Sequence, residues 1–161
     1  MAARKDLFAR ALGVPDRLHM AAHSHHLWPD VTLDAQVDVW RDAAVLADHK
    51  WDKVFGEVYP AAQGLVAREL KLPSPDTVVF APNTHTLLAV LKSAIEHKPV
   101  RILSTDGEFH SFRRQAQRWV EAGEVELTLV ESEASDFAER FIAAARSETY
   151  DLIFVSHVFF K

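Results

Sequence analysis

Polar side chains that could bind a ligand follow three apolar stretches of the chain. The first group is Asn83–Thr86, which follows the apolar stretch Thr77–Ala81 and precedes an apolar helical pattern. The second group is Thr105–Ser111, and the third is Ser156 with His157. A turn that opens a helix presents backbone N–H groups at the positive end of the helix dipole, so it suits an anion such as phosphate. Asn83 or Thr84 could equally be a plain N-cap of the helix. From these residues alone, the N-cap is favoured over a phosphate site.

The second group contains an aromatic side chain beside acidic ones. Phe109 could pack in the core, act as a hydrophobic staple, or offer a face on which a flat ligand stacks. The residues alone favour core or staple. Asp106 and Glu108 could form an acid/base pair, but acidic residues are common in such turns, so this is a weaker interpretation.

Histidines are frequent, with nine in 161 residues, and four of them are His19, His23, His25 and His26. Neutral imidazole is a common metal ligand. The spacing matches no finger pattern, and no cysteine or nearby carboxylate completes a ligand set. A structural or substrate-contacting loop is therefore favoured over a metal site, and no metal ligand is assigned.

Hydrophobic periodicity predicts helices first and then an alternation of strands and helices. Helices are expected over 3–12, from Asp30 to about His49, and from near Trp51 to Leu72 with an interruption at Pro60. Expected strands are Thr77–Ala81, Val100–Ser104, Val125–Val130 and Leu152–Ser156. Expected helices between them are Thr84–His97, Ser111–Ala122 and Ser135–Ser147. We expect Trp40 and Trp119 to pack in the core.

This alternation predicts an α/β fold with three α/β/α layers and a mostly parallel sheet. An N-terminal helical segment with a substrate-side loop covers residues 1–75, and the first part of the large domain covers 76–161. The three polar groups should open on one edge of the sheet, because ligands sit at the carboxyl ends of parallel strands. The chain ends just after an expected strand, so we expect a truncated domain.

Composition excludes several classes of function. The formal net charge of −5, without a basic run, argues against a nucleic-acid partner. The absence of cysteine excludes disulfides and thiolate chemistry and is compatible with a reducing cytoplasm. The sequence shows neither a signal peptide nor an apolar run of membrane-spanning length, so we expect a cytoplasmic protein without a membrane partner.

Several stretches in this order resemble a known family. They are AAHSHHLWP, VVFAPNTHTLLAVL, ILSTDGEFHSFRRQ and DLIFVSHVFFK. Together they resemble the class V aminotransferase group of fold-type I pyridoxal-phosphate (PLP) enzymes, nearest to the kynureninase family. That family shows a GNSLG-like N-terminal loop, an N-[TA]-x-T-x-N-L corner, an E-x-F-P-S-D corner and a later S-x-V strand end. The resemblance covers nearly the whole chain.

The resemblance implies roles for particular residues. His85 and Thr86 match positions that hold the PLP phosphate, and Phe109 matches the aromatic residue that stacks on the pyridine ring. Ser156 matches a residue near the cofactor. His23 and Ser24 match loop residues that lie near the substrate, which is an amino acid in this family.

The resemblance also implies a homodimer, because these enzymes share active sites across two subunits. Phe112 stands where the family carries an aspartate near the cofactor. The Schiff-base lysine of the family has no match up to Lys161, so we assign no catalytic residue and expect this chain alone to be inactive. The alternatives are another class V enzyme (an aminotransferase or a cysteine desulfurase-like lyase) or a non-catalytic α/β binding module.

Overall fold

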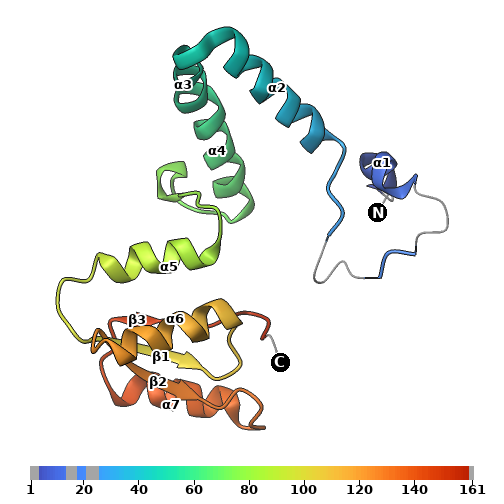
Figure 1. Cartoon of the computed structure of the whole chain (residues 1–161). Helices are drawn as coiled ribbons and strands as arrows, with labels where there is room; N and C mark the ends of the chain where they lie inside the picture. The colour runs from blue at the N-terminus through green and yellow to red at the C-terminus, as the bar shows by residue number, and fades with distance from the viewer. Residues whose placement is uncertain (1–3, 14–17, 21–25, 160–161) are drawn as a thin grey trace. The chain divides into compact units, whose positions relative to one another are not determined.

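The computed structural model describes residues 4–13, 18–20 and 26–159. Residue contacts divide the chain into two compact units, Met1–Val79 and Phe80–Lys161. The described part of the first unit is built from helices, and the second unit alternates helices with strands (Figure 1). None of the helices in the described ranges combines the length and the apolar character needed to cross a membrane.

The first unit is held together by helix contacts and a few polar links. Its elements are a 3₁₀ turn at Arg4–Phe8, α1 (Ala9–Leu12), α2 (Val31–Leu46), a 3₁₀ turn at Ala47–His49, α3 (Lys50–Lys53), α4 (Tyr59–Glu69) and a 3₁₀ turn at Pro75–Thr77. The Lys53 Nζ atom lies 2.6 Å from Oδ2 of Asp42, which ties α3 to α2. This carboxylate raises the pKa of Lys53 above its usual value. The ion pair therefore links α2 and α3 across the turn between them.

The sequence predicted an interruption of the helical stretch at Pro60, but the structure shows none there. A π-helical turn at Val54–Val58 precedes α4, and Pro60 lies in the first turn of α4. Proline lacks an N–H group and its ring clashes with the carbonyl four residues earlier, here that of Gly56. A wider π turn at that point relieves the clash, so the chain continues as helix.

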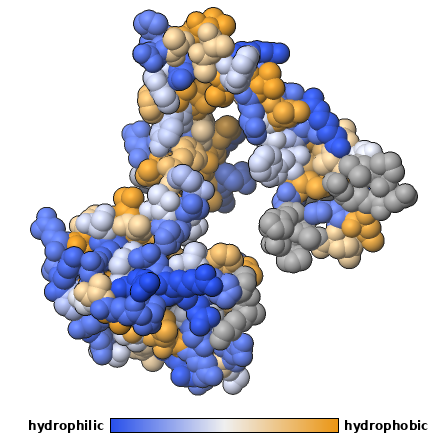
Figure 2. Space-filling view, viewed as in Figure 1, coloured by the Kyte–Doolittle hydropathy of each residue, from blue (hydrophilic) through white to orange (hydrophobic). Residues whose placement is uncertain are grey.

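The apolar face of α2 is exposed rather than packed in a core. Leu33 and Val37 are 50% and 37% exposed, and Trp40 is 72% exposed. The expectation that Trp40 packs in the core was therefore wrong. Helical spacing shows that a face is apolar, but it cannot show what covers that face. Figure 2 shows hydrophobic surface over the helices of this unit.

The segment Thr77–Ala81 is not a strand, which corrects the sequence-based expectation. Pro75–Thr77 forms a 3₁₀ turn, and residues 78–81 have no regular structure. The Nε2 atom of Gln63 donates to the carbonyl oxygen of Val78 at 2.7 Å, so this backbone group is satisfied by α4. An apolar run becomes a strand only where a neighbouring strand is available to pair with it.

The second unit contains a three-stranded parallel sheet, so the α/β class is confirmed. Its elements are α5 (Thr84–Ser93), β1 (Val100–Thr105), α6 (His110–Glu121), β2 (Val125–Val130), α7 (Phe137–Ser147) and β3 (Leu152–Ile153). The strand order is β2-β1-β3, and Val100 pairs with Val125 while Ile102 pairs with Leu152. The strand expected at Leu152–Ser156 is short because only its first two residues pair with β1.

The core lies between the sheet and two helices on one of its faces. Buried residues from α5, α6, β1 and β2 form one cluster: Leu88, Val100, Ile102, Phe112, Ala116 and Val125. Trp119 packs against this cluster, as expected from the sequence. Helix α7 lies on the opposite side of the sheet from α6 (Figure 1). Because β1 and β3 are parallel neighbours, their carboxyl ends lie at the same edge of the sheet. The start of α5 lies at this edge too.

Candidate functional site

A small cavity lies at the carboxyl edge of the sheet in the second unit. Its volume is about 140 Å³. The residues that line it come from the start of α5, the β1–α6 corner and the segment after β3: Thr84, His85, Leu88, Phe109, Ser111, Phe112, Phe154 and Ser156. The structure thus brings His85, Phe109 and Ser156 together, although they are far apart in the sequence.

Asn83 caps α5 and thereby uses polar groups at the start of this helix that could otherwise bind a ligand. Its Oδ1 accepts hydrogen bonds from the backbone N–H of Thr86 at 2.9 Å and from Oγ1 of Thr86 at 3.1 Å. The backbone N–H and the hydroxyl of Thr86, which the resemblance assigned to the phosphate together with His85, are therefore both used in the cap. Thr86 is not among the residues that line the cavity. The structure does not bring this predicted site residue to the cavity.

His85, by contrast, lines the cavity and carries a polar atom without a partner among the described residues. Its Nδ1 is buried and has no hydrogen-bond partner among the described residues. A buried polar atom without a partner costs free energy comparable to a lost hydrogen bond. A ligand atom that pairs with this imidazole would remove that cost. His85 is therefore the residue of the α5 corner best placed to contact a ligand.

The aromatic residues of the cavity divide into an exposed ring and a buried pair. Phe109 precedes α6 at its N-cap position and is 55% exposed, so its ring is accessible. Phe112 and Phe154 stack with centroids 4.3 Å apart and an interplanar angle of 10°. Phe112 is 3% exposed. A carboxylate at position 112 would be buried among apolar side chains, which explains why phenylalanine suits this position here.

The backbone N–H and the hydroxyl of Ser156 both donate to the buried carboxylate of Glu108, a role that the sequence pattern did not predict. Glu108 is 1% exposed and accepts from the backbone N–H of Ser156 at 2.9 Å, from the Ser156 hydroxyl, and from Oγ1 of Thr105 at 3.0 Å. These bonds join the end of β1 to the segment after β3. Glu108 therefore acts as an anchor beneath the cavity, rather than as half of an acid/base pair with Asp106. Only its burial identifies this role.

A second polar link holds the β1–α6 corner from the other side. Oδ1 of Asp106 accepts from the backbone N–H of Ser132 at 2.8 Å and from its hydroxyl at 2.7 Å. Gly107 packs so closely here that a Cβ atom would lie 2.9 Å from Cβ of Ser132. The corner that carries Phe109 is thus held by Asp106 on one side and by Glu108 on the other. This arrangement positions Phe109 at the mouth of the cavity.

The remaining sequence-based candidates lie partly outside the described residues. His23 and Ser24, assigned to the substrate loop, are outside them, and so is His25 of the histidine cluster. His26 contacts the ring of Phe8, with centroids 5.6 Å apart. Within the described ranges, no group of three histidine or carboxylate side chains could hold a metal ion.

Comparison with protein-family models, with curated proteins and with solved structures finds no match to this chain. The assignment of a ligand to the cavity therefore rests on the geometry and chemistry of its lining residues.

Proposed function

We propose that the cavity at the carboxyl edge of the sheet binds pyridoxal phosphate. The chain would then contribute one wall of the active site of a class V aminotransferase-like enzyme, nearest to kynureninase, in a PLP-transferase-like large domain. The observation that carries the proposal is the meeting of three distant segments around one cavity. They supply an unpartnered imidazole nitrogen, an accessible aromatic face and an anchored hydroxyl group.

The lining residues fit the ring and the phosphate of this cofactor. A cavity of about 140 Å³ admits one six-membered ring, since an apolar cavity of about 150 Å³ binds benzene. Phe109 would stack on the ring, and the apolar Phe112 and Phe154 would line its pocket. His85 would pair with the phosphate close to the positive end of the α5 dipole.

The residues of the chain would position the cofactor rather than carry out its chemistry. When bound, PLP supplies an electron sink for bond cleavage next to an amino group. The covalent attachment needs a lysine amine, and the lining residues of the cavity contain none. The proposal therefore assigns no catalytic residue to this chain. An amino-acid substrate and a homodimer belong to the same proposal, because the family resemblance implies both.

The absence of lysine from the cavity lining supports one alternative function. A non-catalytic α/β module could use the same cavity to bind a flat metabolite without any covalent step. Both functions need an occupied cavity, but only the first needs the phosphate of PLP at His85. The contribution of the phosphate group therefore discriminates between them.

Pyridoxamine phosphate is a suitable probe, because it lacks the aldehyde that reacts with surface lysines. We expect calorimetry on the full chain to show saturable binding of pyridoxamine phosphate. Pyridoxamine without phosphate should bind at least tenfold more weakly, which corresponds to about 1.4 kcal/mol. Equal affinity for the two compounds would favour the non-catalytic module, and no binding of either would reject the pyridoxal-phosphate proposal.

A further inference from the structure

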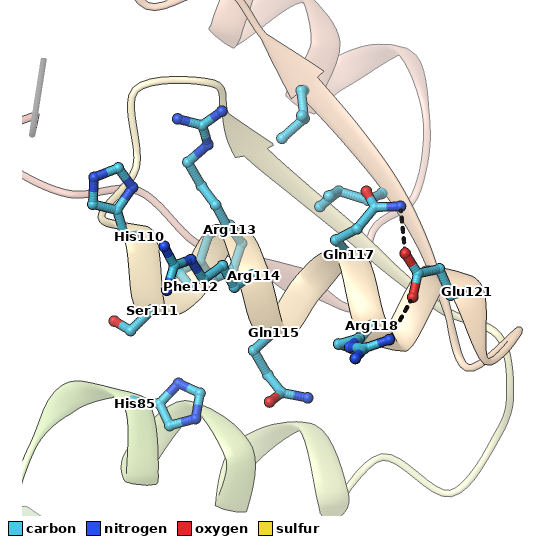
Figure 3. A pocket seen from close by; sticks show the side chains of 12 residues that line it. His85, His110, Ser111, Phe112, Arg113, Arg114, Gln115, Gln117, Arg118 and Glu121 are labelled. Carbon is cyan, nitrogen blue, oxygen red and sulfur yellow. Dashed lines mark hydrogen bonds and ion pairs between the residues drawn. The ribbon is translucent and has the colours of Figure 1, made fainter.

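A second and larger hollow in the same unit is not used by the proposed cofactor site. It is an open groove of about 840 Å³ along α6. Side chains of α6 form most of its lining, Leu127 and Leu129 of β2 contribute an apolar part, and His85 of α5 closes one side (Figure 3). His85, Ser111 and Phe112 line both the groove and the cavity, so the two hollows adjoin.

The charged residues of the groove are mostly basic. Arg113, Arg114 and Arg118 line it, and Glu121 is its one acidic residue, in a chain whose net charge is −5. Glu121 accepts from Nη1 of Arg118 at 3.2 Å, and Figure 3 shows this contact. Arg113 and Arg114 have no carboxylate partner in the described part of the chain. Two neighbouring guanidinium groups are therefore left unneutralised.

Helical spacing concentrates this charge into a row. His110, Arg114 and Arg118 are four residues apart, so they lie on one face of α6, and Arg113 lies about 100° round the helix from Arg114. Like charges at this spacing repel and disfavour the helix. The surface over α6 is strongly hydrophilic in Figure 2. An anion in the groove would remove the repulsion and accept hydrogen bonds from the guanidinium groups.

The length of the row of arginines and the apolar wall of the groove indicate which class of ligand the groove can bind. The arginines run from Arg113 to Arg118, five residues or about 7.5 Å along α6, so a chain of linked phosphate groups can contact more of the row than a single phosphate. Leu129 is 50% exposed beside the arginines and would pack well against an organic group. The groove thus combines a row of cations with an apolar wall.

We propose that this groove binds an organic polyphosphate, with its phosphates along Arg113, Arg114 and Arg118 and its organic part against Leu127 and Leu129. Guanidinium groups bind phosphate oxygens through paired hydrogen bonds, and a planar base can stack on them. The site uses residues that the cofactor proposal does not need. It therefore stands whether or not the cavity binds pyridoxal phosphate.

Magnesium-free ATP and inorganic triphosphate are the probes that test this proposal, by calorimetry on the full chain at low salt. We expect saturable binding of ATP that weakens as salt is raised, because the arginines are exposed. The double variant Arg113→Ala/Arg114→Ala should bind ATP at least tenfold more weakly. The matched control Arg68→Ala/Arg146→Ala removes the same charge from exposed sites elsewhere and should change affinity less than twofold.

Comparison of the two probes tests the apolar wall. Leu129→Ser should weaken the binding of ATP about threefold or more and leave that of inorganic triphosphate unchanged. The proposal is overturned if neither probe binds saturably, or if both double variants lose affinity equally. Equal effects of Leu129→Ser on the two probes would overturn the assignment of the organic part. Failure of pyridoxamine phosphate to bind would reject the cofactor proposal and leave this one standing.

Discussion

The hydroxyl of Ser156 donates its hydrogen to Oε2 of Glu108, while the backbone N–H of Ser156 donates to Oε1 at 2.9 Å. A carboxylate only accepts, so the single hydroxyl hydrogen of Ser156 points toward Glu108 and only oxygen lone pairs remain for the cavity. A ligand group that meets this oxygen must therefore be a donor. Glu108 in this way sets the polarity of one wall of the cavity.

Removal of the Glu108 carboxylate should destabilise the second unit. Glu108→Ala leaves the Ser156 N–H and the Thr105 hydroxyl without their acceptor, and we expect a loss of about 2–4 kcal/mol in the free energy of unfolding, since each orphaned group costs about 1–3 kcal/mol. Urea unfolding measures the loss. Ser156→Ala should cost about 1 kcal/mol, and the double variant should lose less than the sum of the two. Additive losses would show that the two residues do not act together.

Gly107 should not tolerate a side chain. In Gly107→Ala the new Cβ would lie 2.9 Å from Cβ of Ser132, so the corner must shift and disturb the bonds from Ser132 to Asp106. We expect a loss of about 1–3 kcal/mol, typical of an overpacked site, in urea unfolding. Gly64→Ala is the matched control, because its Cβ would meet nothing within 4 Å. A loss no larger than that of the control would contradict the close packing.

The parts of the fold that could be predicted are those that local pattern determines. The strand expected at Val125–Val130 has these bounds in the structure, because an apolar run between two helical patterns had a partner strand in β1. The equally apolar Thr77–Ala81 pairs with no strand among the described residues, and its Val78 carbonyl is bonded by Gln63 instead. Sequence periodicity reports which residues are apolar but not what pairs with them.

The candidate site shows the same limit. His85, Phe109 and Ser156 could be placed together because each follows or opens an element at one sheet edge. The anchoring role of Glu108 could not be predicted, since its burial depends on how two loops meet, and acidic residues in turns are usually exposed. Thr86 matches a family position, but its bonds to Asn83 depend on the local cap geometry.

The stability of the second unit should depend on the ionisation of Glu124. The hydrogen bond and charge of Lys92, with Lys98 nearby, hold the pKa of Glu124 below its usual 4.5. A lowered pKa in the folded state gives stability that is present above about pH 4.5 and is lost as the pH falls through the folded value. Glu124→Gln should therefore be less stable than the natural chain at about pH 7, and the difference should narrow at about pH 3.

Urea unfolding at both pH values measures this difference. Lys92 is only 8% exposed, so loss of its carboxylate partner should lower the free energy of unfolding. Glu126→Gln serves as the control, because the Glu126 side chain is 65% exposed and lies 3.7 Å from Arg101. A difference between Glu124→Gln and the natural chain that stays constant from neutral to acid pH would exclude the ion pair as its cause.

Substitutions at two residues near the start of α5 should have different effects, because Asn83 caps the helix and His85 is proposed to contact the ligand. Asn83→Ala removes the acceptor for the Thr86 amide and should cost about 1 kcal/mol in urea unfolding, the usual cost of a lost N-cap. His85→Ala removes a ring whose Nδ1 has no partner among the described residues, so it should change stability less and weaken pyridoxamine phosphate binding more. If Asn83→Ala weakened pyridoxamine phosphate binding more than His85→Ala does, the ligand contact would belong to the cap rather than to the imidazole.

The most direct test of the central claim is a titration of the isotope-labelled full chain with pyridoxamine phosphate, followed by amide NMR shifts. Saturable shifts should map to the start of α5, the β1–α6 corner and the segment after β3. Phe109→Ala should weaken binding more than twofold and up to about twelvefold, which corresponds to an aromatic stack of about 0.5–1.5 kcal/mol. Phe80→Ala, which removes a similarly exposed ring outside the lining, should change it less than twofold. Shifts that do not saturate, or equal losses in the two variants, would contradict the account.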